Sequence, residues 1–518
     1  MKNITRYITL SMLACGIGTF TQSCNNKLDI TPEGAPSKGN YWKTPEDAVK
    51  GANALYANYD EEEFYGRGFF WFINASDDMV TGRNNAQAEN VRNFSSTYVG
   101  GGYTEPQWQY RYAIIKRAND ILRYVPTISM DGALKKRILG EANFNAGYMY
   151  FQLAANYADE RAGVPIVTVE NMDNELATPR AANIEENYLH VEKLLKSAAD
   201  QLPFFDELAK VDYGRAHKVA AWALLSKMYL YKKDYKNANL YADSVINQGK
   251  RGLEPVFTDV FKASNNWGTE YIWSATSSPS GRSGWGSILP GVMLTNGAWG
   301  LYNGWGYYLP TKELYDSYEK GDARREATIL KPGDKFMFFG EERSFTPAGS
   351  ATCDMQFNKY MEPFSHPSPI GSHVSPNGDH MATDLNVPLI RFAEILLIKA
   401  ESLIMLNGTG AGDKELNLLR KRADLDEMQG MTLTDLKRER RNELAGEFTD
   451  RHRDLVRWGD AAATYAKPLH TYAMVDPATG KPIVFPGRKF DPKIHHVWAV
   501  PQQEIDNSNG IIKQNQGW

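Results

Sequence analysis

The sequence predicts a mainly α-helical protein, in which a tetratricopeptide-like frame of paired helices carries a large, irregular, loop-rich lobe inserted between its two parts. Three observations lead to this fold class. Long segments repeat apolar residues with a period of about 3.6, one pair of them has tetratricopeptide-like spacing, and residues 251–385 lack that period. The composition, 42% hydrophobic and 23% charged, is that of an ordinary globular protein.

The first 23 residues are interpreted as the signal peptide of a lipoprotein. Lys2 and Arg6 give a positive start, and the mainly apolar stretch over residues 7–20 is too short to cross a bilayer of about 30 Å comfortably. Cys24 follows directly and is the expected lipidation site, where two or more acyl chains would hold the chain firmly on a membrane. Cys15 is the alternative acceptor, and a soluble secreted protein with an incidental cysteine is the other alternative.

The helical frame is assigned to residues 40–250 and 386–460, where apolar residues recur on one helix face. Its predicted helices cover residues 46–59, 107–125, 134–158, 185–202, 216–231, 235–248, 388–407 and 414–423. The pair at 216–248 carries the repeat signature, because small residues would let the two helices approach and aromatic residues would fill the space between them. The residues that form this signature are Ser226, Tyr229, Tyr235, Ala238 and Ala242.

The lobe over about residues 251–385 is rich in Gly, Ser, Asn, Pro and aromatic residues, and only a short segment near 312–319 has a helical period. Irregular segments of this length are usually functional or disordered, and this one has too many rings to be disordered. We assign residues 24–518 to a single domain, in which the frame and the lobe are followed by a C-terminal segment at 461–518.

An ordered series of motifs runs along the mature chain from residue 28 to residue 518. It includes 28–32 (LDITP), 41–48 (YWKTPEDA), 118–122 (ANDIL), 140–144 (GEANF), 150–153 (YFQL), 163–166 (GVPI), 214–216 (GRA), 388–397 (PLIRFAEILL), 417–423 (NLLRKRA), 439–447 (ERRNELAGE) and 514–518 (QNQGW). In this series the chain resembles the SusD/RagB family of outer-membrane nutrient-binding lipoproteins.

The resemblance implies a SusD-like fold with four tetratricopeptide-like units and a variable lobe. It also implies capture of an oligosaccharide or polysaccharide at the cell surface, delivery to a SusC-like TonB-dependent transporter, and a lipid anchor in the outer membrane that faces the exterior. The residues after Cys24, at 25–29, lack the acidic cluster that often directs such lipoproteins to the outer face.

Nucleic-acid partners are not expected, because a formal net charge of -4 provides no basic field for phosphates. Three cysteines, at 15, 24 and 353, cannot form a disulfide framework or a four-thiolate zinc site. The adjacent His495 and His496 would point to opposite faces of an extended strand, so no metal is assigned. No cofactor is expected either.

The charged run at 439–458 has two interpretations, an acid–base cluster or a structural set of ion pairs. Arg440 and Arg441 precede Glu443 and Glu447, with Arg440 three and seven residues from these carboxylates, so we expect the four to pair along one helix. The same structural interpretation applies to Arg391 with Glu394 and Glu401. The usual local signatures of enzymes are missing from the sequence, and a non-enzymatic protein is expected.

Glycan capture needs flat rings against the C–H faces of sugars and polar groups that read hydroxyls. The stretch at 285–308 mixes rings with glycines, and Trp285, Trp299, Tyr302 and Trp305 are its candidate ligand-binding residues. The alternative is that these rings pack the lobe onto the frame. Trp222, Trp267, Trp273, Trp458 and Trp498 are interpreted as packing residues.

A second candidate stretch covers residues 69–85, in a loop between predicted helices. Trp71 could be a sugar platform or a core residue, and Asp77, Asp78, Arg83 and Asn84 could bind hydroxyls. The sequence thus predicts a non-enzymatic glycan-binding lipoprotein. The alternatives are a transporter lid for peptide or another nutrient, and a secreted glycoside hydrolase, whose two carboxylates no single sequence excludes.

Overall fold

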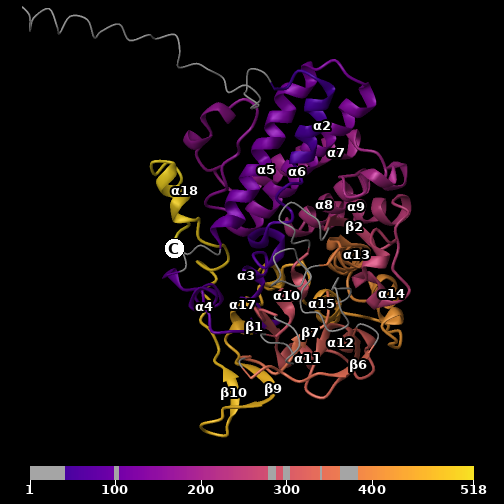
Figure 1. Cartoon of the computed structure of the whole chain (residues 1–518), viewed down its shortest axis with the longest axis vertical. Helices are drawn as coiled ribbons and strands as arrows, with labels where there is room; N and C mark the ends of the chain where they lie inside the picture. The colour runs from indigo at the N-terminus through magenta and orange to yellow at the C-terminus, as the bar shows by residue number, and fades with distance from the viewer. Residues whose placement is uncertain are drawn as a thin grey trace, which may run out of the picture.

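The structure is a computed structural model, and it describes residues 41–97, 104–277, 287–295, 304–338, 341–349, 351–361 and 383–518. The predicted signal peptide and Cys24 lie outside the described residues. Helices dominate the described chain, which confirms the predicted fold class (Figure 1). Among the described helices, none combines the length and the apolar character that a membrane crossing requires.

The first part of the frame is a succession of helices in which α5 packs on α6, α6 on α7, α7 on α8 and α8 on α9. Their bounds are α2 Pro45–Ala54, α5 Glu105–Tyr124, α6 Gly132–Tyr157, α7 Ile184–Gln201, α8 Lys218–Tyr231 and α9 Tyr235–Gln248. Side chains cap several N-termini: Asp131 accepts from the backbone N–H of Leu134, and Asn183 accepts from that of Glu186. Helix α2 is shorter than predicted, because the chain turns after Ala54.

The pair α8–α9 has the close approach that the repeat signature predicts. Ser226, Ala238 and Ala242 are fully buried, and the Ser226 hydroxyl donates to the carbonyl of Ala238 at 2.8 Å. Tyr229 stacks on Tyr241 with the ring centroids 5.7 Å apart. Small side chains and paired rings therefore join these two helices as expected.

The second part of the frame packs on the first, although a long stretch of sequence separates the two parts. Helix α13 (Phe392–Asn407) packs on α9, and α14 (Asp413–Arg422) and α15 (Leu433–Leu444) pack on α13. The prediction of a helix from residue 388 was wrong at its start, since Val387–Arg391 form strand β8. Pro388 explains the difference, because proline lacks the N–H of a helix interior and favours an extended residue before it.

Short strands and helices form the rest of the chain. Five antiparallel strand pairs are described: β1 (Met79–Thr81) with β3 (Tyr308–Pro310), β2 (Tyr271–Ala275) with β8, β4 (Ile329–Leu330) with β7 (Gln356–Phe357), β5 (Lys335–Phe338) with β6 (Glu341–Ser344), and β9 (Leu469–Val475) with β10 (Pro482–Phe485). The short helices are η1 Glu62–Gly66, α3 Phe70–Ile73, α4 Ala86–Arg92, α10 Leu289–Met293, α11 Lys312–Tyr315, α12 Ala323–Thr328, α16 Arg451–Trp458, α17 Ala461–Tyr465 and α18 Gln502–Asn507. Short 3₁₀ segments are η3 Val125–Thr127, η4 Met172–Ala177, η5 Phe205–Glu207, η6 Lys210–Asp212, η7 Phe257–Phe261 and η8 Ala263–Asn265.

A buried ion-pair network joins α15 to the sheet β2–β8 and to the lobe. Arg391, at the end of β8, pairs with Glu270 and Glu443 at 2.6 Å each and with Glu447 at 2.6 Å. Arg324 of α12 reaches Glu443 at 3.2 Å. The structural role predicted for this charged run is confirmed, and the side chains are enclosed in the protein interior.

The partners within the run differ from the expected pairs along one helix. Arg440 pairs with Asp454 at 2.6 Å and with Glu394 at 3.1 Å, and Glu447 lies beyond the end of α15. Glu401 pairs with Arg457 rather than with Arg391. Spacing along the sequence shows only local partners, whereas here buried guanidinium groups join separate elements.

The C-terminal segment folds back onto the frame. The N–H of Trp498 donates to the carbonyl of Asn156, at the C-terminal end of α6, at 2.8 Å. Trp498 and Trp273 are 0% and 2% exposed, which confirms their predicted packing role. Trp222, Trp267 and Trp458 are partly buried.

Candidate functional site

The strand pair β1–β3 brings the two candidate ligand-binding stretches together. Thr81 lies opposite Tyr308, and the N–H of Gly82 donates to the carbonyl of Tyr307 at 2.9 Å. Arg83 and Asn84 leave this sheet at the end where Trp305 enters it. An antiparallel pair of strands therefore joins residues that are more than 200 positions apart in sequence.

Two glycines make this junction tight. A Cβ atom on Gly82 would lie 2.1 Å from the carbonyl oxygen of Gly306, which is closer than any side chain allows. Gly306 itself has a φ of 56°, in the left-handed region that glycine adopts without strain. Gly306 therefore forms the turn between Trp305 and Tyr307.

Four residues form what we call the ring platform: Arg83, Asn84, Trp305 and Tyr307. Trp305 is partly buried, and its ring centroid lies 6.1 Å from that of Tyr307. The guanidinium carbon of Arg83 lies 5.1 Å from the centroid of the Tyr307 ring, within cation–π range. Asn84 is exposed. Arg83 and Trp305 thus both pack against Tyr307, and Asn84 follows Arg83 directly along the chain.

The floor beneath the platform is the aromatic side chain of Trp71, which lies under Tyr307. Tyr307 is 8% exposed and meets the fully buried Trp71 edge to face, with the centroids 5.7 Å apart. The indole N–H of Trp71 donates to Glu63 at 3.2 Å. The sequence allowed two interpretations of Trp71, a sugar platform or a core residue. In the structure Trp71 lies in the core, below Tyr307.

Arg67 ties this floor to η1. It pairs with Glu62 at 2.9 Å and with Glu63, and it donates to the hydroxyl of Tyr307. Burial acts to lower the pKa of Arg67, but Glu63, Glu62 and Tyr307 together outweigh burial and the pKa is raised. Arg67 was missed by the sequence reasoning, although the spacing of Glu63 and Arg67 is that of an i, i+4 helical ion pair.

Asp77 and Asp78 lie inside the protein rather than at its surface. Asp77 is 6% exposed and Asp78 is 1% exposed, and both pair with Arg441, at 3.1 and 2.6 Å. Arg451 pairs with Asp77 at 3.0 Å. Burial acts to raise the pKa of Asp77, but the two arginines outweigh it and lower this pKa, whereas burial raises the pKa of Asp78.

This arrangement differs from the predicted hydroxyl-binding role of the two aspartates. Their carboxylates anchor α15 and α16 to the segment before β1, and so they position the platform from behind. Of the other predicted residues, Arg83 and Trp305 both pack against Tyr307, and the exposed Asn84 lies next to Arg83 in the chain. Trp285, Trp299 and Tyr302 lie outside the described residues.

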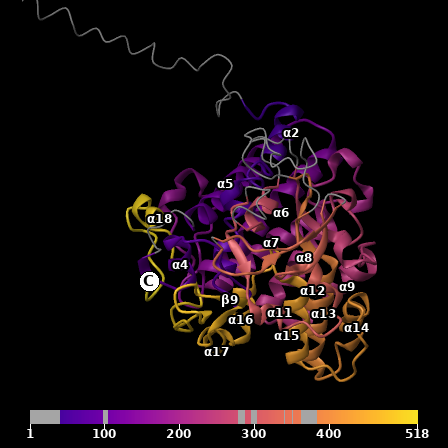
Figure 2. The ribbon, with the colours of Figure 1, turned by 60° about the horizontal axis from the view of Figure 1, so that its bottom comes forward.

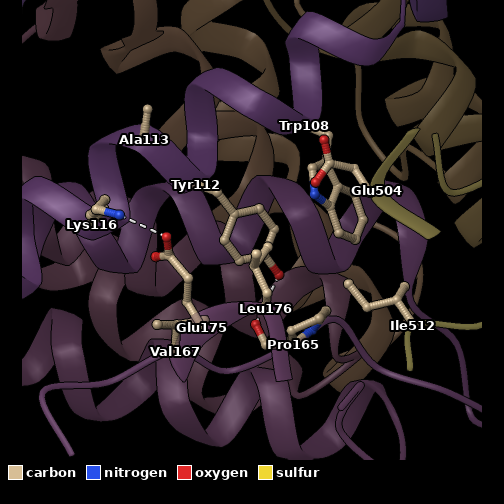
Figure 3. Close-up of a pocket in the computed structure, with 10 residues that line it drawn as sticks. All are labelled: Trp108, Tyr112, Ala113, Lys116, Pro165, Val167, Glu175, Leu176, Glu504 and Ile512. Atoms are coloured by element: carbon tan, nitrogen blue, oxygen red, sulfur yellow. Dashed lines mark hydrogen bonds and ion pairs between the residues drawn. The ribbon is translucent and has the colours of Figure 1, made fainter. Parts of the chain in front are cut away.

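A separate pocket of about 230 Å³ lies on the frame, against helix α5 (Figure 3). Its walls are Trp108, Tyr112, Ala113, Lys116, Pro165, Val167, Glu175, Leu176, Glu504 and Ile512. Lys116 and Glu175 pair at 2.7 Å on one side, and burial raises the pKa of Glu504 on the other. The pocket is mostly apolar and contains none of the predicted ligand-binding residues.

Comparisons with known proteins agree on one family. Residues 254–518 match the family model described as "SusD family", and residues 46–230 match the one described as "Starch-binding associating with outer membrane". A SusD-like protein of Bacteroides ovatus is 26% identical over an alignment of 377 residues that covers 68% of this chain and 65% of that relative.

Solved structures show the same fold. A SusD-like carbohydrate binding protein of Bacteroides fragilis superposes with a TM-score of 0.75 at 22% identity, over 90% of this chain and 98% of that chain. A laminarin binding SusD-like protein superposes with a TM-score of 0.72 at 25% identity, over 92% of this chain and 100% of that chain. With one family model matching the C-terminal half and a related one matching the frame, this chain belongs to the SusD family.

Proposed function

We propose that this protein binds an oligosaccharide or polysaccharide at the ring platform. The observation that carries the proposal is the convergence of Trp305, Arg83 and Asn84 at one end of the sheet β1–β3. An indole that is only partly buried can lie against the C–H face of a sugar, and guanidinium and amide groups are suited to hydroxyls. Trp285, Trp299 and Tyr302 are proposed to add further rings to this site.

The names of the relatives support a glycan as the ligand. One family model is described as starch-binding, and one structural neighbour as laminarin binding. Each stacking contact contributes about 0.5 to 1.5 kcal/mol. A few rings and hydrogen bonds therefore correspond to dissociation constants in the range of about millimolar to micromolar. Weak capture suits a protein that must release its cargo.

We propose further that the protein is anchored through Cys24 in the outer membrane, faces the exterior and passes its ligand to a SusC-like TonB-dependent transporter. The family description "associating with outer membrane" supports the location. A Cys24→Ala variant should lose its acylation and leave the membrane fraction. Affinity purification of the native chain should recover the transporter, and recovery without it would contradict the delivery step.

The site favours binding over hydrolysis. A glycosidase uses two carboxylates about 5 to 10 Å apart, one of which donates a proton. Glu62 and Glu63 are linked to Tyr307 of the platform through Arg67, with which both are paired, and the pair Asp77 and Asp78 is buried against arginines. These carboxylates are engaged in holding the structure.

The test is native gel electrophoresis through a panel of plant, microbial and host polysaccharides, with the chain from Asn25 onward. Retardation by one polymer, lost in Trp305→Ala and Trp299→Ala and weakened in Asn84→Ala, is expected. Tyr472→Ala is the matched control, because Tyr472 is an aromatic residue of β9 that is 36% exposed. If Trp305→Ala is still retained by the polymer, the binding site is not the ring platform, and the pocket in Figure 3 becomes the candidate. If no polymer retains the native chain, the alternative of a transporter lid for peptide or another nutrient is favoured.

A further inference from the structure

A second concave site lies among α15, α16 and α17, which Figure 2 shows gathered with α11 in the lower part of the view. Its volume is about 360 Å³. We call it the basic pocket, and it is lined by Ser317, Lys437, Arg438, Arg441, Arg451, Leu455, Trp458, Asp460, Ala463, Thr464 and Lys467. The lining residues of α15 and of α16 each recur at helical spacing, and the segment 460–467, which contains α17, closes the same space.

The charge of this lining is unlike that of the whole chain. Five cationic side chains and one carboxylate face the basic pocket, in a protein whose net charge is -4. Lys437 pairs with that carboxylate, Asp460, at 2.6 Å. Arg441 pairs with Asp78 and Arg451 pairs with Asp77, and both aspartates lie on the interior side of these arginines.

Three cations retain hydrogen-bonding capacity toward the basic pocket. Arg451 uses Nε and Nη2 on Asp77, while its Nη1 has no hydrogen-bond partner among the described residues. Arg438 contacts Glu319 at 3.2 Å and Asp435 at 3.5 Å, and its side chain is 35% exposed. Lys467 is exposed and forms no ion pair with any residue that the structure describes.

We infer that the basic pocket binds an oxyanion, a carboxylate or sulfate group, carried by an acidic glycan. Arginine forks match the geometry of such groups, and a charge-assisted hydrogen bond is stronger than a neutral one. The identity of the carrier rests on the proposed glycan-binding function. The site is a recess between helices, of the size that takes part of a small ligand, which suits a substituent on a sugar better than a flat membrane surface.

The inference is tested by titration calorimetry of the chain from Asn25 onward with three probes: dextran sulfate, polygalacturonate and neutral dextran. Binding of at least one of the two charged polymers is expected, weakened by added sodium chloride, together with no binding of neutral dextran at this site. Arg438→Gln and Lys467→Gln should each raise the dissociation constant about tenfold, because each removes a charged contact. Lys236→Gln on α9 is the matched control, as an exposed lysine outside the basic pocket.

Equal affinities in both variants and in the control would overturn the inference. So would binding of phosphatidylglycerol vesicles that the two variants lose while their affinity for the charged polymers is unchanged, since the basic pocket would then contact the membrane. Thermal unfolding of each variant checks that the fold is intact, and Lys467→Gln is expected to be neutral there because Lys467 is exposed. The ring-platform proposal and the basic-pocket proposal can be refuted independently. Trp305→Ala tests the ring platform with an uncharged polymer, whereas Arg438→Gln and Lys467→Gln test the basic pocket with charged polymers.

Discussion

Replacing Glu443 by glutamine is expected to destabilise the protein strongly without touching the ring platform. Glu443 is 0% exposed, and its carboxylate meets Arg391 at 2.6 Å, Arg324 at 3.2 Å and Arg422. Glutamine keeps the shape of the side chain but removes its charge. Three buried guanidinium groups would then share fewer carboxylates.

The magnitude follows from the charge balance of the network. Its buried cations are Arg324, Lys359, Arg391, Arg420 and Arg422, and its buried carboxylates are Glu270, Asp322, Glu439, Glu443 and Glu447, five of each. The Glu443→Gln change leaves one uncompensated positive charge in the interior. Breaking a buried pair in this way costs about 3 to 5 kcal/mol of unfolding free energy.

Urea unfolding at pH 7 measures this loss. Glu192→Gln is the matched control, because its pair with Lys196 on α7 is 22% and 48% exposed and should contribute at most about 0.5 kcal/mol. The double variant Glu443→Gln/Arg422→Gln should cost less than the sum of the single changes, since the second change removes a cation that the first leaves unpaired. A loss below about 1 kcal/mol for Glu443→Gln would refute the assignment of this carboxylate to a stabilising network.

The pH dependence of the same variant gives an independent check. Burial acts to raise the pKa of Glu443, but Arg422, Arg391 and Arg324 outweigh it, and the folded-state pKa lies well below 4.5. The stabilisation is therefore present above the unfolded pKa and is lost as the pH falls toward the folded value. The difference between native chain and variant should shrink below about pH 4.

Three further predictions concern single buried positions. Burial lowers the pKa of His217 to about 3, so its neutral form stabilises the fold above pH 6.5, and this stabilisation falls by about 1.4 kcal/mol per pH unit below pH 6.5. The His217→Asn variant keeps a helix-capping acceptor and should flatten this pH dependence of the unfolding free energy in urea. An unchanged slope would contradict the prediction. Burial raises the pKa of the Cys353 thiol to about 12, so a chain from Asn25 onward should react with a thiol reagent at pH 8 only after denaturation, and rapid labelling of the native protein would show that the thiol is accessible. Gly82→Ala should cost about 1 to 3 kcal/mol and weaken glycan retention, because its Cβ meets the carbonyl of Gly306; unchanged retention would mean that the strand junction does not position the ring platform.

The helical frame was predictable because its helices are long enough to show their period. Helices α10 and α12, of one to two turns, were missed since so few residues reveal no period. Pro388 lies near the start of the extended segment before α13, and the mainly apolar run 389–398 concealed the boundary between strand and helix at Arg391.

The candidate site was predictable as two stretches, but not as one surface. The pairing of β1 with β3 links them, and three-residue strands leave too little pattern in a sequence to reveal their partner. Asp77 and Asp78 illustrate the same limit, because their burial depends on Arg441 and Arg451, which lie more than 360 residues away. Charge partners that lie far apart in the sequence can be identified only once the fold is known.

The ring platform is tested most directly by titration calorimetry with an oligosaccharide cut from the polymer that retards the native protein. The native chain should bind it with a dissociation constant of about millimolar to micromolar. Trp305→Ala should weaken this binding about tenfold, and Tyr472→Ala should leave it unchanged. Equal affinities of the native chain and of a folded Trp305→Ala variant would contradict glycan capture at this site.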